Sequence, residues 1–393
     1  MDLRRVPPPV ELPSDPELLR AIRAEIERDG PMTFARFMEI ALYDPARGYY
    51  RGPVPRPGRA GDFLTAPEAS PVFGRTLARF VTAVHEVLGR PDALAIREYG
   101  AGAGALAAPL VRALLEETPG PATIRYLVAE VEPSRAETVA ARLAAERLDP
   151  ARIAVEADDG APIEGVVIAN EVLDALPTHR VVVRDGALRE LFVGIGDDDA
   201  LADIEAEPST PALADRLAAD GIELAEDQHG EVCLELDQWV ETAAAGLASG
   251  VLLLIDYGHP AAELYDPRRR AAGTLATYLG HTVGEDPYRA IGRQDITAHV
   301  DFSAVARAAT AAALDPIGEA TQTDFLARLG IGDLLVAEQT RPGASLPAYL
   351  ETRSAVIRMI DPGAMGRFRV VAFGRGIAAD PPLAGFRPAD RPH

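Results

Sequence analysis

The sequence contains no lysine, so all 39 of its basic residues are arginines. Schiff-base chemistry on lysine, including the anchoring of pyridoxal phosphate, is therefore excluded, as is the phosphate-binding loop with its obligatory lysine. The single cysteine, Cys233, can form no intrachain disulfide, which is consistent with a reducing compartment. The longest clean apolar run, 251–255, is far shorter than the roughly 20 residues that cross a bilayer, so we expect no membrane span.

An excess of acidic residues sets the charge of the chain. Its 60 aspartates and glutamates outweigh the arginines and give a formal net charge of −21. Because contacts to phosphates need a basic face, we expect no nucleic-acid partner. The charge suits a cationic cofactor or a basic substrate instead. The first residues carry charges and prolines where a signal peptide has an apolar stretch, and we expect a cytoplasmic protein.

Short apolar runs alternate with helical patterns over much of the chain. This alternation predicts an α/β fold built on a parallel sheet. We expect helices at 106–117 and 133–148, and strands at 93–99, 124–129, 153–156, 166–169, 251–256 and 368–373.

The pattern also suggests a division into segments. We expect flexible proline-rich tails at 1–15 and 378–393, and two interruptions of the alternation. The first interruption holds a hairpin around Arg184-Asp185-Gly186 and a helix near Trp239. The predicted segments are an N-terminal helical part with a long loop (16–70), a core (71–256) with an insertion (179–245), a lid or substrate lobe (257–330), and the last part of the core sheet (331–377).

A glycine-rich turn follows the first predicted strand, in the sequence REYGAGAGAL. Gly100, Gly102 and Gly104 permit a tight turn and a close backbone approach, and the next helix offers unpaired N–H groups at its start. Such a turn fits the methionine end of S-adenosyl-L-methionine (SAM), the pyrophosphate of a dinucleotide, or tight strand–helix packing alone.

Acidic residues around the turn favour SAM. Glu130 ends the second strand, where a carboxylate can accept hydrogen bonds from both ribose hydroxyls. Glu98 lies just before the first glycine, separated from it by Tyr99, at a position usual for methyltransferases. Asp158 follows the third strand, where an adenine contact is expected. The spacing also tolerates NAD, but the sequence offers no recognisable site for hydride transfer.

Two later strands end in further polar residues. Asn170, Glu171 and Asp174 follow the fourth strand, and Asp256 and Tyr257 end the fifth. The carboxyl ends of central strands are where α/β enzymes place their chemistry. Acids that converge there are costly unless they meet cations, such as a sulfonium or a guanidinium. The histidines lack the spacing of a metal site, and we expect no bound metal.

Taken together, these segments resemble the MidA-like methyltransferases, whose mitochondrial members are assembly factors of respiratory complex I. The resemblance extends from about residue 31 to 375. It includes the segments PMTFARFMEIALYDPARGYY, GDFLTAPEASPVFG, EYGAGAGAL, ANEVLDALPTHRVV, LLIDYGH, GTLATYLGH, GRQDITAHVDFSAV, TQTDFLARLGI and DPGAMGRFRVVAFG.

The resemblance implies a Rossmann-like class I SAM-dependent methyltransferase with a mostly parallel seven-stranded sheet. It also implies N-methylation of arginine in a protein, such as a respiratory-complex subunit. We expect Asn170 among the cofactor-binding residues. Because the acids cluster at strand ends, we expect Glu171 and Asp174 to grip the guanidinium and accept its proton, with Asp256 and Tyr257 in support. Methylation of a small molecule or peptide and a non-catalytic SAM-binding assembly factor remain alternatives, and a homodimer remains open.

Overall fold

The computed structural model describes residues 12–51, 64–341, 343–377, 380 and 382–387, so most of the two predicted tails lies outside the described residues. The chain forms two compact units, each assembled from three separate stretches. Unit 1 comprises Met1–Leu64, Ala175–Glu235 and Ala262–His299, and unit 2 comprises Thr65–Asp174, Leu236–Ala261 and Val300–His393. The segment boundaries proposed from the sequence remain a prediction.

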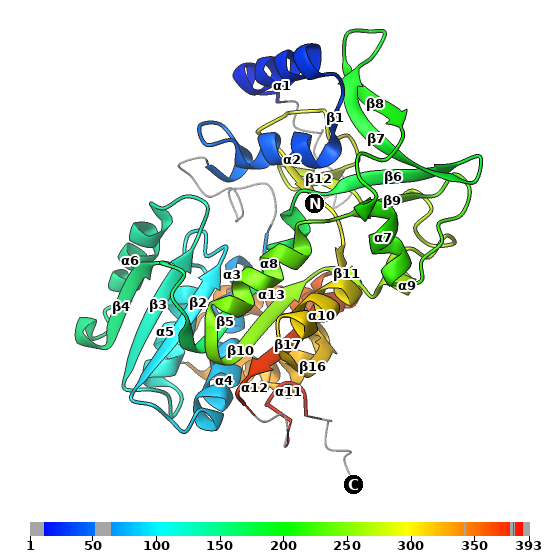
Figure 1. Ribbon diagram of the computed structural model, residues 1–393. Helices are drawn as coiled ribbons and strands as arrows, with labels where there is room; N and C mark the ends of the chain where they lie inside the picture. The colour runs from blue at the N-terminus through cyan, green and yellow to red at the C-terminus, as the bar shows by residue number, and fades with distance from the viewer. Residues whose placement is uncertain (1–11, 52–63, 342, 378–379, 381, 388–393) are drawn as a thin grey trace. The chain divides into compact units, whose positions relative to one another are not determined.

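Unit 2 is built on a seven-stranded sheet in the order β16-β17-β10-β5-β2-β3-β4 (Figure 1). The α/β fold expected from the sequence is therefore present, but a mostly parallel sheet is not confirmed. The sheet is mixed, because β17 runs antiparallel to both β10 and β16, whereas the other four pairings are parallel. The strands are β2 (Ala93–Tyr99), β3 (Thr123–Ala129), β4 (Ile153–Ala157), β5 (Ile163–Asn170), β10 (Leu247–Asp256), β16 (Asp315–Thr321) and β17 (Arg369–Arg375).

The central strands are apolar because helices cover them. Five consecutive residues of β5, Val166 to Ala169 among them, are buried. The helices α4, α5 and α6 pack in sequence against one another, and α8 and α10 form a second group in front of the sheet in Figure 1. The helices of unit 2 are α3 (Ala66–Ala69), α4 (Val72–Val87), α5 (Ala107–Glu116), α6 (Arg135–Ala145), α8 (Leu236–Ala245), α10 (Phe302–Ala311), α11 (Gln322–Arg328), α12 (Ile331–Thr340) and α13 (Leu346–Ile360).

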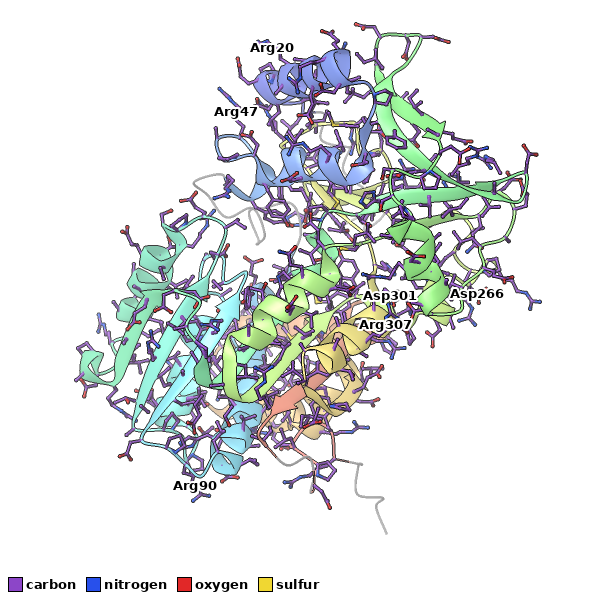
Figure 2. The ribbon with its side chains drawn as sticks, in the orientation of Figure 1. Arg20, Arg47, Arg90, Asp266, Asp301 and Arg307 are labelled. Atoms are coloured by element: carbon purple, nitrogen blue, oxygen red, sulfur yellow. The ribbon has the colours of Figure 1, made fainter. Side chains whose placement is uncertain are left out.

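Local capping fixes where several of these helices begin. Asp301 precedes α10 and accepts hydrogen bonds from the backbone N–H groups of Ser303 and Ala304 (Figure 2). Thr321 does the same for α11, since its hydroxyl accepts from the N–H of Asp324 at 3.1 Å. Such caps satisfy backbone donors that the helix itself leaves unpaired.

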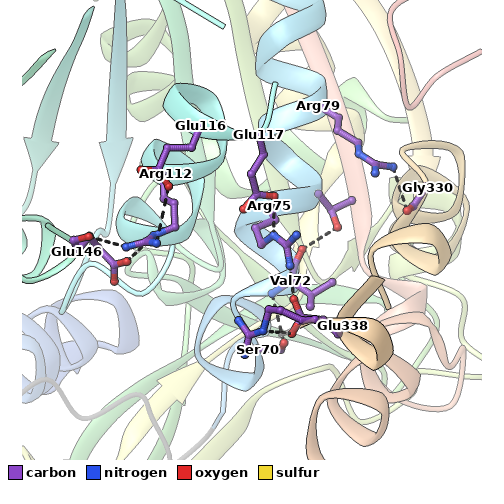
Figure 3. A network of polar contacts seen from close by, with 12 residues as sticks. Ser70, Val72, Arg75, Arg79, Arg112, Glu116, Glu117, Glu146, Gly330 and Glu338 are labelled. Carbon is purple, nitrogen blue, oxygen red and sulfur yellow. Dashed lines mark hydrogen bonds and ion pairs between the residues drawn. The ribbon is translucent and has the colours of Figure 1, made fainter. Parts of the chain in front are cut away.

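Ion pairs tie the C-terminal helices to α4 (Figure 3). The Arg75 guanidinium binds Glu117, beyond the end of α5, at 2.8 Å and also contacts Glu338 on α12. One turn further along α4, Arg79 donates to the carbonyl of Leu329 at 2.7 Å. The contacts to Glu338 and Leu329 join residues 263 and 250 positions apart in the sequence.

In its described residues, unit 1 combines two sheets with the helices α1, α2 and α7 and most of the short helix α9 (Ala261–Leu264). The larger sheet has the order β1-β7-β6-β9, with β8 also on β7, and the smaller has the order β13-β12-β14. Asp185 and Gly186 both have positive φ and form the two-residue turn between β6 and β7, which confirms the predicted hairpin. The elements are α1 (Pro16–Asp29), β1 (Met32–Thr33), α2 (Phe34–Tyr43), β6 (His179–Arg184), β7 (Ala187–Ile195), β8 (Leu201–Ala206), α7 (Ala212–Ala219), β9 (His229–Val232), β12 (Ala276–Leu279), β13 (Thr282–Gly284) and β14 (Asp295–Thr297).

The core of unit 1 lies between α1, α2 and the strands. Leu18 and Ile22 of α1 pack with Phe34 and Phe37 of α2, and all four side chains are buried. Across the described residues, none of the helices combines the length and the apolar character needed to cross a membrane.

Candidate functional site

The glycine-rich turn lies in unit 2, between the end of β2 and the start of α5. Gly100, Gly102 and Gly104 have φ values of 69°, 53° and 73°, a left-handed conformation that favours glycine. The N–H of Gly100 donates to the carbonyl of Ala129 at 3.1 Å, which holds the turn against the end of β3. A Cβ atom added at Gly102 would have no neighbour within 4 Å, so this face of the turn is open.

Glu130 follows β3 and supports the same turn. Its Oε1 accepts a hydrogen bond from the N–H of Gly102 at 2.6 Å. Burial raises the pKa of this carboxyl, although the Gly102 N–H acts in the opposite direction. The structure thus brings Glu130 and the turn together, and the ribose contact expected for Glu130 remains a prediction.

Glu98, at the end of β2, is buried beneath the turn. The Tyr126 hydroxyl on the neighbouring strand donates to its carboxyl group. Burial raises the pKa of Glu98 to about 8, and the nearby Glu130 adds to the shift. A pKa near 8 keeps this carboxyl group largely protonated at neutral pH, and the cofactor contact expected for Glu98 remains a prediction.

Asp158 is held in an ion pair that the sequence did not reveal. The guanidinium of Arg97, which is fully buried, binds the Asp158 carboxylate at 2.8 Å. Arg97 also donates to the carbonyls of Gly246 and Ala161, at 2.6 and 2.7 Å. Asp158 thus stabilises the interior of unit 2, and the adenine contact expected for it remains a prediction.

The carboxyl end of β5 carries a strained residue. Glu171 has a φ of 55°, although it is not a glycine, and its N–H donates to the Ile255 carbonyl at 2.8 Å. Its Oε1 accepts from the side-chain amide of Asn170 at 3.1 Å and from the N–H of Ala66 at 3.4 Å. Burial and the neighbouring Asp174 raise the pKa of Glu171 to about 8.

Asp256, at the end of β10, binds the chain that follows β5. Its Oδ2 accepts from the N–H groups of Val172 and Leu173, at 3.1 and 2.9 Å, and its Oδ1 accepts from the N–H of Tyr257. Burial, then Asp174 and Glu171, raise the pKa of Asp256 well above its usual range. The structure therefore brings the three predicted catalytic acids into one electrostatic cluster.

Tyr257 directly follows Asp256, and its backbone N–H donates to the Oδ1 of that carboxylate at 2.9 Å. Its aromatic ring packs against Phe368, with the ring centroids 5.3 Å apart. Asn170 is more suggestive, because its Oδ1 is buried and has no hydrogen-bond partner among the described residues. An acceptor of this kind is satisfied when a ligand donates to it.

Sequence reasoning missed two charged residues of this region. Glu68, on the short helix α3, is half-buried, and its Oε2 accepts from the Thr65 hydroxyl at 3.3 Å. Arg142, on α6, donates to the Ala103 carbonyl of the glycine turn at 3.1 Å. The acid in the segment TAPEAS was a visible signal for Glu68, whereas nothing in the helical pattern of α6 distinguishes Arg142. Over the described ranges, no group of three or more His, Cys, Asp or Glu side chains could hold a metal ion.

Comparison with known proteins gives this region a context. Residues 76–320 match a family model of SAM-dependent methyltransferases. A relative from Mus musculus, named protein arginine methyltransferase NDUFAF7, mitochondrial, is 30% identical and covers 80% of this chain and 74% of its own length. The relative of the same name from Xenopus tropicalis is 28% identical over 94% of this chain and 89% of its own length.

Solved structures agree with the sequence relatives. A protein from Burkholderia thailandensis bound to S-adenosyl-homocysteine (SAH) has a TM-score of 0.86 and 35% identity, over 97% of this chain and 99% of that one. A second crystal structure from the same organism has a TM-score of 0.81 and 34% identity, over the same shares. The cytoplasmic location expected from the sequence is wrong on these comparisons, because the curated relatives are named mitochondrial.

Proposed function

The chain belongs to the MidA-like family of SAM-dependent methyltransferases, and on that premise we propose that it methylates an arginine side chain of a protein substrate. The names of the mouse and frog relatives support arginine as the acceptor. The observation that carries the proposal is the acid cluster at the ends of β5 and β10, where the pKa of Glu171 reaches about 8.

The residues of unit 2 fit SAM. The open side of Gly102 leaves room for a ligand against the turn, and the buried Oδ1 of Asn170 can accept a hydrogen bond from an amino group. We propose that Glu130 binds the ribose, which is supported by its hydrogen bond to the N–H of Gly102 in the turn. When bound, SAM supplies a methyl group on a positively charged sulfur.

Glu171 is the residue we assign to the acceptor. A guanidinium has a pKa above 12 and must lose a proton when it is methylated. A carboxylate whose pKa is near 8 takes up that proton more readily than an ordinary glutamate, whose pKa is 4.5. The entering cation would itself drive Glu171 into its charged form, because opposite charges favour ionisation.

Asp256 and Asp174 act through Glu171. Three backbone N–H groups occupy the Asp256 carboxylate, so it fixes the turn after β5 rather than binding an acceptor. Asp174 adds negative charge and is buried, and it raises the pKa of both neighbours. We therefore assign Asp256 as a positioning residue and Asp174 as an electrostatic one.

The test is methyl transfer with isotope-labelled SAM, followed by mass spectrometry of the labelled products. We expect the label on arginine, and we expect Glu171→Gln to lower kcat/KM by roughly 10²- to 10⁴-fold while SAH binding is retained. The matched control is Glu164→Gln, an exposed acid near the other end of the same strand, which should leave both unchanged.

The other outcomes separate the alternatives. Label on a small molecule or a free peptide would mean that the methyl acceptor is not a protein, although the methyl-transfer reaction is the one proposed. Tight SAH binding without transfer to any component of a cell extract would favour a non-catalytic SAM-binding protein. Full activity in Glu171→Gln would show that Glu171 takes no part in proton transfer.

A further inference from the structure

We propose that Glu68 is a specificity-determining residue of the cofactor site, and that its carboxylate favours the positively charged methyl donor over the product with a neutral sulfur. The inference rests on the proposed placement of SAM between the glycine turn and the ends of β5 and β10. It does not depend on arginine being the methyl acceptor.

The position of Glu68 follows from the contacts of α3. The first residue of this short helix, Ala66, donates its N–H to the Glu171 carboxylate at 3.4 Å. Two residues later, Glu68 is oriented by the Thr65 hydroxyl, which donates to its Oε2 at 3.3 Å. The Glu68 side chain is therefore held near the strand end that carries Asn170 and Glu171.

An electrostatic interaction, without a hydrogen bond among the described contacts, links Glu68 to the glycine turn. The pKa of Glu68 is raised by burial and lowered by the Arg142 guanidinium, which itself contacts the turn at the Ala103 carbonyl. Glu68 in turn raises the pKa of Glu171. Glu68 thus interacts with a group at each side of the space where the methyl donor would bind.

This placement has a consequence for turnover. Carboxyl groups that repel one another are relieved when a cation binds among them. SAM carries a sulfonium charge, whereas SAH, the product, has a neutral thioether. Transfer of the methyl group therefore removes the charge that Glu68 recognises, and the product is bound less tightly than the donor.

The test is isothermal titration of the full chain with SAM and with SAH, in the wild type and in Glu68→Gln. We expect the variant to bind SAM about tenfold more weakly, since one charge–charge contact at partial burial is lost. Binding of SAH should change by less than about twofold. The control Glu86→Gln, on the exposed side of α4, should leave both affinities unchanged. Glu68→Ala repeats the test should Glu68→Gln not fold.

Each outcome decides a different point. Equal weakening of SAM and SAH in Glu68→Gln would show that Glu68 only shapes the site, and unchanged binding of both would show that it does not contribute. Either result overturns the inference and leaves the proposed function intact. If wild-type protein binds neither ligand, the cofactor placement itself fails, and the inference fails with it.

Discussion

Among single residues, Glu98 provides a test of the buried electrostatics. Its pKa in the folded chain is about 8, whereas an unfolded glutamate has 4.5. Between those values the unfolded chain has released this proton and the folded chain has kept it, so the free energy of unfolding falls as pH rises. Below pH 4.5 both states are protonated, and above pH 8 both are ionised, so the dependence ends at those limits.

We therefore predict that Glu98→Gln removes this part of the pH dependence. Glutamine keeps an acceptor for the Tyr126 hydroxyl but carries no titrating proton. The stability of the variant relative to the wild type should increase by about 1.4 kcal/mol for each pH unit within that range. Urea unfolding at several pH values measures it, and parallel curves for the two proteins would contradict the buried, protonated carboxyl.

Asp158 shows what the sequence could not predict at this scale. Its place after a strand suggested a contact to adenine, but a pattern of residue types does not show that Arg97 points from β2 to the same carboxylate. We predict that Asp158→Asn destabilises the fold by on the order of 3 kcal/mol, since it leaves a buried guanidinium without its counterion.

The neighbouring Asp159 provides a matched control for that prediction. It is exposed and caps the turn through the Ala161 N–H, so Asp159→Asn should cost no more than about 0.5 kcal/mol. Denaturant unfolding and SAH titration are measured on both variants. Loss of SAH binding in Asp158→Asn at unchanged stability would instead support the adenine contact.

Among the elements, the turn between β2 and α5 allows an effect of a mutation on folding to be distinguished from an effect on ligand binding. Gly102 and Gly89 both have positive φ and open space around an added Cβ. An alanine at either position should therefore lower the free energy of unfolding by a similar amount, about 1–2 kcal/mol. We predict that only Gly102→Ala also weakens SAH binding, because its methyl group enters the space in front of the turn. Equal affinities in the two variants would mean that the ligand does not approach Gly102.

The strands show which elements could be predicted from the sequence. The sequence located β2 and β3 closely from the short apolar runs 93–96 and 126–129, because central strands are covered on both faces. It located the apolar end of β10, but this strand begins at Leu247 rather than at the predicted residue 251. β16 was missed because it lies at the sheet edge, and of its seven residues only Ile317 is buried. Its pairing with β17 joins Asp315 to Gly374, and such a register between distant segments is not contained in local periodicity.

At the scale of the whole molecule, the same limitation applies to the site. The sequence located the acids at each strand end, since the end of an apolar run is a local signal. It did not reveal Glu68, because the proximity of α3 to Glu171 depends on how helices pack, and not on any spacing between positions 68 and 171. Strand ends were thus predictable, whereas partners from other elements were not.

The net charge of −21 leads to a prediction about the acceptor. A strongly acidic protein attracts a cationic substrate over a range that salt shortens, from about 30 Å at 10 mM to about 8 Å at physiological ionic strength. For an acceptor peptide found by the isotope transfer described above, KM should rise several-fold between low and moderate salt while kcat stays constant. The matched substrate has the same target arginine with its flanking basic residues replaced by glutamates, and its KM should fall or stay level as salt is added. If both peptides respond alike, the overall charge serves solubility and does not guide the acceptor to the site.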